Sequence, residues 1–376
     1  MEYREFGKTG TKVSILGFGA MRLPVYENNG KHLVREEESL KMIIRSFELG
    51  TNYIDTAFPY CYEQSEIVVG KALKMWESKN KQSGIYIATK LPTWKIKKTS
   101  DFWFYLEKQL ARLDVGCIDF YHIHSLNEDY FEEKIIKLNM EKEVQKAKDQ
   151  KMIRHISFSF HDSPEVLKKI IDVGFFETVL CQYNILDQSN SEAIEYAHSK
   201  GVGVAIMGPL GGGRIKDVEF FKQELGSKKG HIDELALKFV FSNKNISIAL
   251  SGMESMEMVE ENLKTANGAY MLTEKESAII NKFLSQKELG ELIPCTNCKY
   301  CLPCPSNVNI PKTLKLMNYY TVTGLKANAS WQYKDIVLDN TSKLADSCTE
   351  CGECEEKCPQ GIKIVDKLKE SHNALG

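Results

Sequence analysis

The chain has 376 residues, of which 43% are hydrophobic and 27% charged, and its formal net charge is −2. A balance this close to neutral gives no long-range attraction to nucleic acid or to an anionic membrane, so we expect neither as a partner. The N-terminus lacks the apolar run of a signal peptide. No apolar segment comes close in length to the about 20 residues that a helix needs to span a bilayer. We therefore expect a cytoplasmic protein, and its length suits one large domain plus a small one or two ordinary domains.

The first predicted element is a β-hairpin. Residues 3–6 and 12–15 flank the turn sequence Gly7-Lys8-Thr9-Gly10. From about residue 13 to residue 266, short β-branched or apolar runs then alternate with longer amphipathic stretches. The runs predict eight strands, at residues 15–20, 52–55, 85–90, 118–124, 155–158, 179–183, 202–207 and 246–251. The stretches between them predict helices at residues 37–49, 65–76, 102–113, 134–148, 164–173, 191–199, 232–241 and 255–267.

Eight strand–helix units in about 250 residues are the expected size and period of an α/β protein of the (β/α)8, or TIM, barrel type. The competing doubly wound sheet normally has fewer strands and a glycine-rich first turn. Leu16-Gly17-Phe18-Gly19 matches that turn poorly, because no third glycine opens a helix after it. The sequence therefore predicts a barrel over residues 1–270.

The strand–helix alternation stops after Asn267. A helix predicted over residues 272–286 would connect two domains across residues 271–290. Pro294 then precedes a cysteine-rich region, and residues 311–318 again have a helical pattern. We expect residues 291–376 to form a small, mainly helical ferredoxin-like domain.

Eleven cysteines are present, and eight of them lie in two short runs near the C-terminus. Disulfides would need an oxidising compartment, which the expected location does not offer. The first run is Cys295-x2-Cys298-x2-Cys301-x2-Cys304-Pro305, and the second is Cys348-x2-Cys351-x2-Cys354-x3-Cys358-Pro359. Such spacing lets three thiolates of one run converge on a 4Fe–4S cluster, while the cysteine before proline reaches the other cluster.

The two runs resemble those of two-cluster ferredoxins. The resemblance implies one cluster on Cys295, Cys298, Cys301 and Cys358, and a second cluster on Cys304, Cys348, Cys351 and Cys354. The 43 residues between the runs favour a helical module over a small β one. Paired C-x2-C units also hold zinc, which stays the alternative.

Four polar residues stand at or just after the ends of predicted strands. Asp55 ends the second strand, Tyr60 follows it, Lys90 ends the third and His124 the fourth. Active sites of (β/α)8 barrels lie at these C-terminal strand ends.

With these four residues at such positions, residues 1–270 resemble the aldo-keto reductases. With the cysteine runs added, the whole chain resembles the bacterial and archaeal branch of that family with a C-terminal 4Fe–4S domain. The resemblance implies reduction of a carbonyl, which needs a hydride at carbon and a proton at the developing alkoxide. It implies that Asp55, Tyr60, Lys90 and His124 are catalytic, with His124 orienting the carbonyl oxygen or sharing the proton transfer. Tyr60, with an ordinary pKa near ~10, would give the proton because Lys90 favours the phenolate and Asp55 holds Lys90 ionised. We interpret the neighbouring His122 as barrel filling.

The resemblance also implies a nicotinamide cofactor. The residues that match its binding positions are Ser159, Gln182, Tyr183, Asn184, Pro209, Leu210, Gly211, Gly213, Ser251, Gly252, Glu261 and Asn262. Leu180 stands where the family has a glutamine that contacts the carboxamide. Gly252 and Met258 stand where the family has the lysine and arginine that bind the 2′-phosphate of NADPH. The sequence therefore leaves NADPH and NADH both open.

Clusters carry single electrons, whereas a nicotinamide carries a hydride, which is a two-electron unit. Joining the two usually calls for a flavin, or for two clusters that lose their electrons in sequence. In the interpretation we favour, the barrel reduces a small aldehyde or ketone with NAD(P)H, and the clusters are structural or regulatory. In a second, FMN in the barrel takes electrons through the clusters from a ferredoxin-like partner. In a third, the barrel has lost catalysis and the protein relays or senses electrons. The sequence specifies neither the oligomeric state nor the substrate, whose contacts we expect in loops that include residues 22–31 and 125–133.

Overall fold

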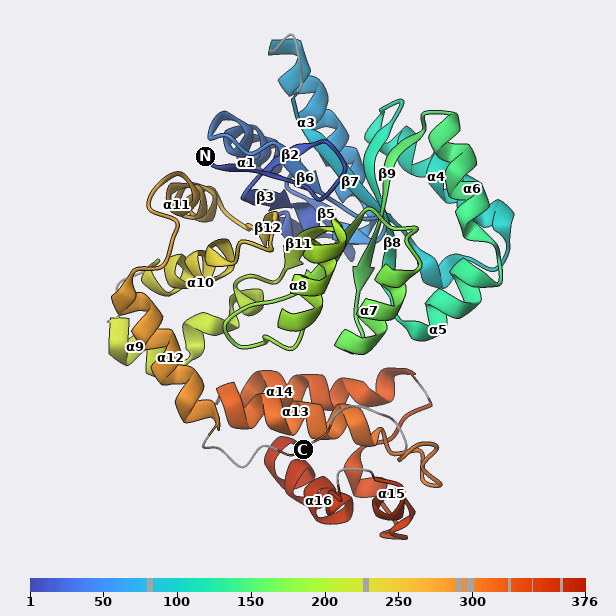
Figure 1. Cartoon of the computed structure of the whole chain (residues 1–376), viewed down its shortest axis with the longest axis vertical. Coiled ribbons are helices and arrows are strands. Elements are labelled where there is room, and N and C mark those ends of the chain that lie inside the picture. The colour runs from blue at the N-terminus through green and yellow to red at the C-terminus, as the bar shows by residue number, and fades with distance from the viewer. Residues whose placement is uncertain are drawn as a thin grey trace. The chain divides into compact units, whose positions relative to one another are not determined.

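The computed structural model describes residues 1–79, 84–225, 230–288, 293, 295, 301–323, 326–339, 341–358 and 361–376. Eight parallel strands close into a barrel in the order β10-β11-β12-β3-β6-β7-β8-β9, and pairing of β9 with β10 completes the ring (Figure 1). The predicted strands and the (β/α)8 fold are thus confirmed. The strands are β3 (Leu16–Gly19), β6 (Tyr53–Asp55), β7 (Tyr86–Leu91), β8 (Ile118–Leu126), β9 (Ile153–Phe160), β10 (Thr178–Gln182), β11 (Gly203–Met207) and β12 (Ile248–Gly252).

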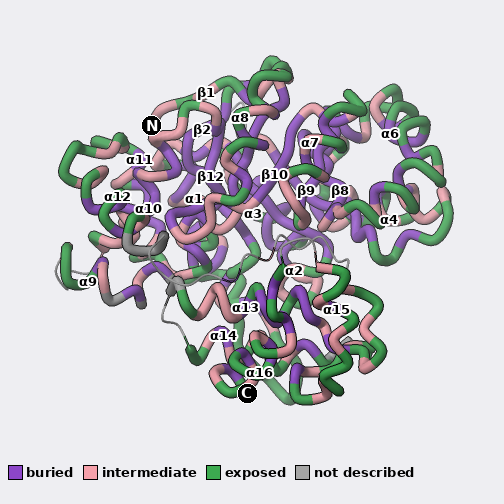
Figure 2. The backbone as a smooth tube through the Cα atoms, turned by 60° about the horizontal axis from the view of Figure 1, so that its bottom comes forward, coloured by how far each residue is buried: buried purple, intermediate pink, exposed green. Residues whose placement is uncertain are grey.

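Helices cover the outside of the barrel, because each crossover must return the chain to the start of the next parallel strand. Figure 2 shows the strands mostly buried, while the helices alternate between buried and exposed positions. These helices are α1 (Glu36–Glu48), α3 (Ser65–Lys79), α4 (Thr99–Leu113), α6 (Met140–Asp149), α7 (Pro164–Asp172), α8 (Ser191–Lys200), α10 (His231–Ser242) and α11 (Met256–Asn267). In α7, for example, Leu167, Ile170 and Ile171 form one buried face, Ser163 caps the N-terminus and Pro164 begins the helix.

The predicted N-terminal hairpin is confirmed and closes the N-terminal end of the barrel. β1 (Tyr3–Glu5) pairs antiparallel with β2 (Lys12–Ser14). The ring of Phe6, just after β1, lies 5.8 Å from that of Tyr53 and 4.9 Å from that of Phe120. A Cβ on Gly203, the first residue of β11, would lie 2.5 Å from the Phe6 ring, so glycine is required there. The opposite end, where the strands finish, stays available for a site.

The single helix predicted over residues 134–148 is wrong. A π-helical segment, Phe131–Ile136, is followed by α6, which begins only at Met140. Between them Asn139 has a left-handed backbone with φ of 49°, a conformation that asparagine adopts more readily than most residues. The apolar pattern does not reveal this break, because Ile135 and Val144 on either side are both buried.

The loop after β3 contains a second hairpin, which the sequence analysis missed. β4 (Val25–Asn28) pairs antiparallel with β5 (Lys31–Val34). Asn29 and Gly30 form the turn with positive φ values of 51° and 74°. Asn-Gly between two strands is a strong hairpin signal, so the dipeptide could have predicted it. His32 of β5 stacks on Tyr62, which lies in the short helix α2 (Tyr60–Glu63), at 4.4 Å between ring centroids.

Two compact units divide the chain. The first consists of Met1–Gly212 and Lys229–Leu272, and the second of Gly213–Lys228 and Thr273–Gly376. In the second unit, α9 (Glu219–Leu225) packs against α12 (Glu274–Glu288), with the rings of Phe221 and Phe283 4.7 Å apart. Lys282 and Glu224 form an ion pair at 2.5 Å between the same two helices.

The cysteine-rich part of the second unit is helical, as predicted. Its helices are α13 (Ile310–Thr323), α14 (Lys326–Lys334), α15 (Glu353–Glu356) and α16 (Ile364–Leu375). They enclose a core of their own that includes Leu314, Tyr333 and Leu368. Val308 and Lys343 form a single parallel β-bridge. In the parts of the chain that the structure describes, no helix combines the length and the apolar character needed to cross a membrane.

Candidate active site and cysteine pocket

Lys90 and Asp55 form a buried ion pair at the C-terminal ends of neighbouring strands. Lys90 Nζ lies 2.6 and 2.8 Å from the two carboxylate oxygens of Asp55, and it donates a third hydrogen bond to the Thr56 carbonyl at 2.8 Å. The two side chains are only 1% and 6% exposed. Burial lowers the pKa of Lys90, but its charge interactions and hydrogen bonds with Asp55 and Tyr60 together outweigh burial and raise that pKa above its ordinary value. Lys90 is therefore an ammonium held in one place.

Tyr60 lies beside this ammonium. It begins α2, five residues after Asp55, and Lys90 Nζ is 4.7 Å from the centre of its ring. Burial raises the pKa of the Tyr60 hydroxyl, and the charge of Lys90 opposes that rise. The phenol therefore keeps its proton at neutral pH, while a cation stands next to it that can stabilise the phenolate.

The turn after the candidate catalytic tyrosine has an unusual backbone. Residues 61–63 have φ values of 50°, 57° and 64°, although none of them is glycine. A left-handed backbone costs roughly 1–2 kcal/mol for a residue that carries a Cβ, so side-chain contacts must hold the turn. The Cys61 thiol donates to the Met21 carbonyl at 3.4 Å, and the Glu63 carboxylate pairs with Arg112 at 2.5 Å.

His124 lies on β8 and faces the same tyrosine. Its ring is perpendicular to that of Tyr60 at 6.0 Å between centroids, and the ring of Trp94 lies 5.1 Å away on another side. His124 Nδ1 is buried and has no hydrogen-bond partner among the described residues. Burial, with the nearby charge of Lys90, lowers the pKa of His124 to about 2. The imidazole is therefore neutral at neutral pH.

A buried polar network lies behind Lys90, and the sequence analysis did not identify it. Glu66, 1% exposed, accepts hydrogen bonds from Thr89 Oγ1 and Gln109 Nε2, each at 2.6 Å. Gln109 also donates to the Lys90 carbonyl at 3.0 Å, and Arg112 lies 3.3 Å from the Glu66 carboxylate. The only sequence signal is the three-residue spacing of Gln109 and Arg112, which puts both on one face of α4.

Two residues that the resemblance assigned to the nicotinamide lie in different surroundings. Ser159 is buried near the end of β9, where its hydroxyl oxygen accepts the backbone N–H of Ser125 at 2.7 Å. Tyr183, just after β10, stacks on Phe239 of α10 at 5.2 Å and belongs to the core of the barrel unit. The Tyr183 ring therefore contributes to the packing of α10 on the barrel.

The glycine-rich loop after β11 is tied to the end of β10. Asn184 Nδ2 donates to the Gly208 carbonyl at 2.9 Å, and a Cβ on Gly208 would lie 3.1 Å from the Gln182 side chain. The predicted loop residues follow it, with Pro209 buried, Leu210 half-buried, and φ of 58° and 88° at Gly211 and Gly213. Positive φ at successive glycines exposes backbone N–H groups of the kind that bind phosphate.

The loop after β12 carries the remaining predicted cofactor residues. Asn262 Nδ2 donates to Ser251 Oγ at 3.1 Å, and both side chains are buried. Gly252 is exposed, and a Cβ there would meet the Arg22 side chain at 3.2 Å. Glu261 is half-buried on α11. Arg22 therefore lies over Gly252, next to the Ser251–Asn262 pair.

The arginines near this loop are paired with carboxylates. Arg22 bonds Glu254 at 2.8 Å, and it also donates to the Gly212 carbonyl at 3.3 Å. Arg45 of α1 pairs with Glu260 of α11 at 2.6 Å. Their positive charges are thus largely compensated within the protein.

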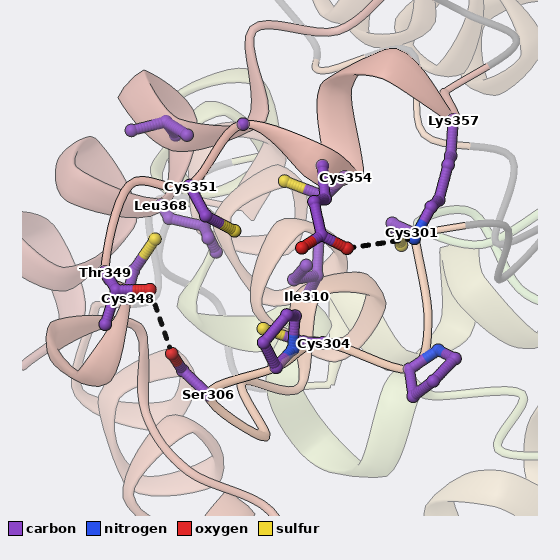
Figure 3. Close-up of a pocket in the computed structure, with 15 residues that line it drawn as sticks. Cys301, Cys304, Ser306, Ile310, Cys348, Thr349, Cys351, Cys354, Lys357 and Leu368 are labelled. Carbon is purple, nitrogen blue, oxygen red and sulfur yellow. Dashed lines mark hydrogen bonds and ion pairs between the residues drawn. The ribbon is translucent and has the colours of Figure 1, made fainter.

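Cysteines from both runs line one pocket in the second unit. Cys304 of the first run is there with Cys348, Cys351 and Cys354 of the second, and Cys301 lines it as well (Figure 3). The backbone N–H of Glu350 donates to the sulfur of Cys348 at 3.4 Å. Burial raises the pKa of Cys354 to about 11, so its thiolate needs a cation beside it. Of the five cysteines that line the pocket, the four of the predicted set, with a backbone N–H donor beside Cys348, fit an iron–sulfur cluster.

The other predicted ligand set is only partly described. Cys295, Cys301 and Cys358 pack at the edge of the C-terminal core. Cys298 lies outside the described residues. Within the described ranges, no three His, Cys, Asp or Glu side chains are grouped to hold a single metal ion.

Comparison with known proteins defines the class to which this barrel and this cysteine pocket belong. The family model "Aldo/keto reductase family" matches residues 15–285, and "4Fe-4S dicluster domain" matches residues 294–362. The protein is an oxidoreductase. It belongs to the aldo/keto reductase family, whose members use a nicotinamide cofactor, and it carries a C-terminal 4Fe–4S domain. The predicted family is thus confirmed.

Individual relatives agree with this assignment. L-galactose dehydrogenase of Arabidopsis thaliana is 28% identical over 298 residues, which are 70% of this chain and 87% of the relative. The oxidoreductase YqkF of Bacillus subtilis is 23% identical over 76% of this chain and 97% of its own length. The holo form of aldo-keto reductase AKR11C1 from Bacillus halodurans superposes with a TM-score of 0.62 and 25% identity, covering 75% of this chain and 96% of that one.

Proposed function

We propose that the protein reduces an aldehyde or ketone with a nicotinamide cofactor at a site formed by Asp55, Tyr60, Lys90 and His124. The observation that supports this most is the buried Lys90–Asp55 pair, whose ammonium lies 4.7 Å from the Tyr60 ring. Removing two charges from water is costly, so such a pair at the strand ends of a barrel is typical of a catalytic site.

Each residue has a separate task in this proposal. The bound nicotinamide would supply the hydride that reaches the carbonyl carbon. Tyr60 donates its hydroxyl proton as negative charge grows on the carbonyl oxygen, and Lys90 stabilises the phenolate that remains. Asp55 keeps Lys90 charged and in place. His124, being neutral, can hydrogen-bond the carbonyl oxygen and orient it without adding a charge.

The pH dependence of kcat follows from these groups. An ordinary histidine titrates near ~6.5, but His124 has its pKa lowered to about 2 and stays neutral well below that pH. The raised pKa of Tyr60 keeps the proton available on the alkaline side. We therefore expect kcat for carbonyl reduction to be flat from about pH 6 to about pH 10, the ordinary pKa of tyrosine, and to fall only above that as Tyr60 loses its proton. Initial rates across this range test it, and an acid limb near ~6.5 that vanishes in His124→Gln would contradict it.

We further propose that NADH is preferred over NADPH. The 2′-phosphate of NADPH needs uncompensated positive charge, whereas Arg22 and Arg45 are paired with Glu254 and Glu260. The positive φ glycines after β11 suit the pyrophosphate, which both cofactors share. The site therefore fits a nicotinamide dinucleotide without favouring the phosphorylated form.

The variant Glu254→Gln tests this preference. It removes one negative charge and releases the Arg22 guanidinium, so kcat/KM with NADPH should rise about tenfold, or about 1.4 kcal/mol, while kcat/KM with NADH changes less than about twofold. The matched control is Glu37→Gln, which breaks the exposed Glu37–Lys41 pair of α1. A wild-type protein that already uses NADPH better than NADH would refute the proposal.

For the second unit we propose two 4Fe–4S clusters. One is assigned to Cys304, Cys348, Cys351 and Cys354, and the other to Cys295, Cys298, Cys301 and Cys358. The pocket that gathers the first set supports this, and bound clusters would supply one-electron chemistry or structural stability. The proposed domain limits are residues 1–270 for the barrel, 271–290 for the connection and 291–376 for the iron–sulfur domain. Zinc in place of iron would show as metal without acid-labile sulfide.

The proposed function is tested with cluster-replete protein prepared without oxygen. We expect it to oxidise NADH or NADPH in the presence of at least one member of a broad panel of aldehydes and ketones. No carbonyl-dependent oxidation across the panel would refute the proposal. A bound flavin that is reduced by a ferredoxin-like protein would instead support the FMN interpretation, and turnover of neither kind would support an electron relay or sensor.

A further inference from the structure

The guanidinium of Arg112 joins two segments that carry candidate catalytic residues. Its Nη2 lies 2.5 Å from the Glu63 carboxylate, in the turn after the tyrosine. Its Nη1 lies 3.3 Å from the Glu66 carboxylate and 3.5 Å from the Phe58 carbonyl. The guanidinium carbon is also 4.2 Å from the centre of the Phe58 ring. With its side chain only 14% exposed, Arg112 contacts the polypeptide on both sides of Tyr60.

The turn on one side needs to be held. Residues 61–63 have left-handed backbones, with Glu63 the furthest into that region at φ of 64°. Glycine would adopt this conformation freely, but these three side chains oppose it. On one side of the turn, Cys61 donates to the backbone after β3, and Tyr62 stacks on His32 of the β4–β5 hairpin. On the side of α4, the Arg112–Glu63 ion pair holds the turn.

On its other side, Arg112 contacts Glu66, which belongs to the polar network around Lys90. Glu66 is almost fully buried, and it shares Gln109 with the backbone carbonyl of Lys90. Thr89, the residue before Lys90, donates to the same Glu66 carboxylate at 2.6 Å. Glu66 therefore connects the strand that carries the lysine to Arg112, and Arg112 connects Glu66 to the turn that follows the tyrosine.

We propose that Arg112 is a positioning residue, which acts through Glu63 to hold the turn at residues 61–63 and so keeps the Tyr60 ring beside Lys90. It is not a catalytic residue, because its contacts are with the turn and with Glu66 rather than with the reacting groups. Only the expected effect on kcat rests on the proposed function, because the role of Arg112 in holding the turn does not depend on the reaction. A displacement of about 1 Å at a reacting group can cost about a hundredfold in rate, so a looser turn has a measurable effect.

Two replacements of Glu63 separate conformation from charge. Glu63→Ala removes the ion pair and leaves a Cβ on a left-handed backbone, so the turn relaxes, and we expect kcat to fall about tenfold or more with KM changed less than about threefold. Glu63→Gly also removes the pair but favours the same backbone, so we expect kcat within about threefold of the wild type. The matched control is Glu36→Ala, which breaks the Lys71–Glu36 pair, where the carboxylate is 46% exposed against 45% for Glu63.

A second measurement keeps the proposal testable if no carbonyl substrate is found. Amide hydrogen exchange of the peptide over residues 56–66, in intact cluster-replete protein, should be faster in Glu63→Ala and near the wild-type rate in Glu63→Gly. In Arg112→Lys, a single ammonium replaces the two guanidinium nitrogens that contact Glu63 and Glu66, so it cannot hold both carboxylates in the same geometry. We expect its kcat and its exchange rate to resemble those of Glu63→Ala. Wild-type kcat and exchange in Glu63→Ala would overturn the proposal. So would equal losses in Glu63→Ala and Glu63→Gly, because they would point to the charge of Glu63 instead of the turn.

Discussion

Replacement of Tyr60 with phenylalanine is expected to lower kcat for carbonyl reduction by about 10²- to 10⁴-fold, the usual contribution of a general acid. The hydroxyl is the only group that the change removes, so the ring and its packing against Lys90 and His124 remain. KM for the nicotinamide should change little, because the proton is needed only as the alkoxide forms. Steady-state rates of the two proteins at equal cluster content measure the effect.

The neighbouring tyrosine offers a control. Tyr62→Phe makes the same chemical change two residues away, on a side chain that is 58% exposed and stacked on His32. The kcat of Tyr62→Phe should lie within about twofold of the wild-type value. Unchanged turnover of every accepted substrate in Tyr60→Phe would show that the proposed site is idle, and it would favour a barrel that relays electrons without catalysing carbonyl reduction.

Replacement of Cys304 with alanine should remove a whole cluster, although Cys304 belongs to the first cysteine run. Its sulfur lines the same pocket as Cys348, Cys351 and Cys354 of the second run (Figure 3). Loss of one of four thiolates should leave the cluster unbound, so iron and acid-labile sulfide should each fall to about half of the wild-type content.

The pairing across runs is what this experiment decides. Cys304→Ala and Cys351→Ala should each lose the same cluster. The double variant should therefore keep about half of the wild-type iron and acid-labile sulfide, as each single variant does. Cys117→Ala, a half-buried cysteine of the barrel unit, should keep the full content. A double variant with no iron left would mean that Cys304 and Cys351 serve different clusters and would contradict the assigned ligand sets.

The barrel could be predicted because its signal repeats. Eight apolar runs at a regular spacing need only be recognised as a set, and errors at single boundaries do not change the fold. Single features were harder. The helix over residues 134–148 was wrong because the left-handed Asn139 breaks the backbone without breaking the apolar pattern. The β4–β5 hairpin was missed even though its Asn29-Gly30 turn is a recognised signal.

The four candidate catalytic residues could be proposed from sequence because strand ends of a barrel converge, whatever the loops do. The structure does bring Asp55, Tyr60, Lys90 and His124 together. The predicted role of Tyr183 in cofactor binding stays a prediction, and the structure adds that its side chain stacks on Phe239 of α10. A strand end gives the position of a residue, but the direction of its side chain depends on packing that the motif does not contain.

The supporting contacts could not be predicted. Glu66, Gln109 and Arg112 are ordinary polar residues of helices in the sequence, and each would be expected in water. Their burial follows from how α3 and α4 pack beside β7, which brings together residues 23 to 46 positions apart. The left-handed turn at residues 61–63 is equally hidden, because it contains none of the glycines that usually mark such a backbone.

The most direct test of the account is an anaerobic absorption spectrum of the cluster-replete protein, recorded as NADH and then an accepted aldehyde or ketone are added. We expect NADH alone to leave the cluster absorption unchanged and no flavin band to be present. NADH should then be oxidised when the carbonyl compound is added. In Tyr60→Phe we expect no oxidation of NADH by the carbonyl compound on the same timescale. Bleaching of the clusters or of a flavin by NADH alone, with no response to any carbonyl, would contradict it.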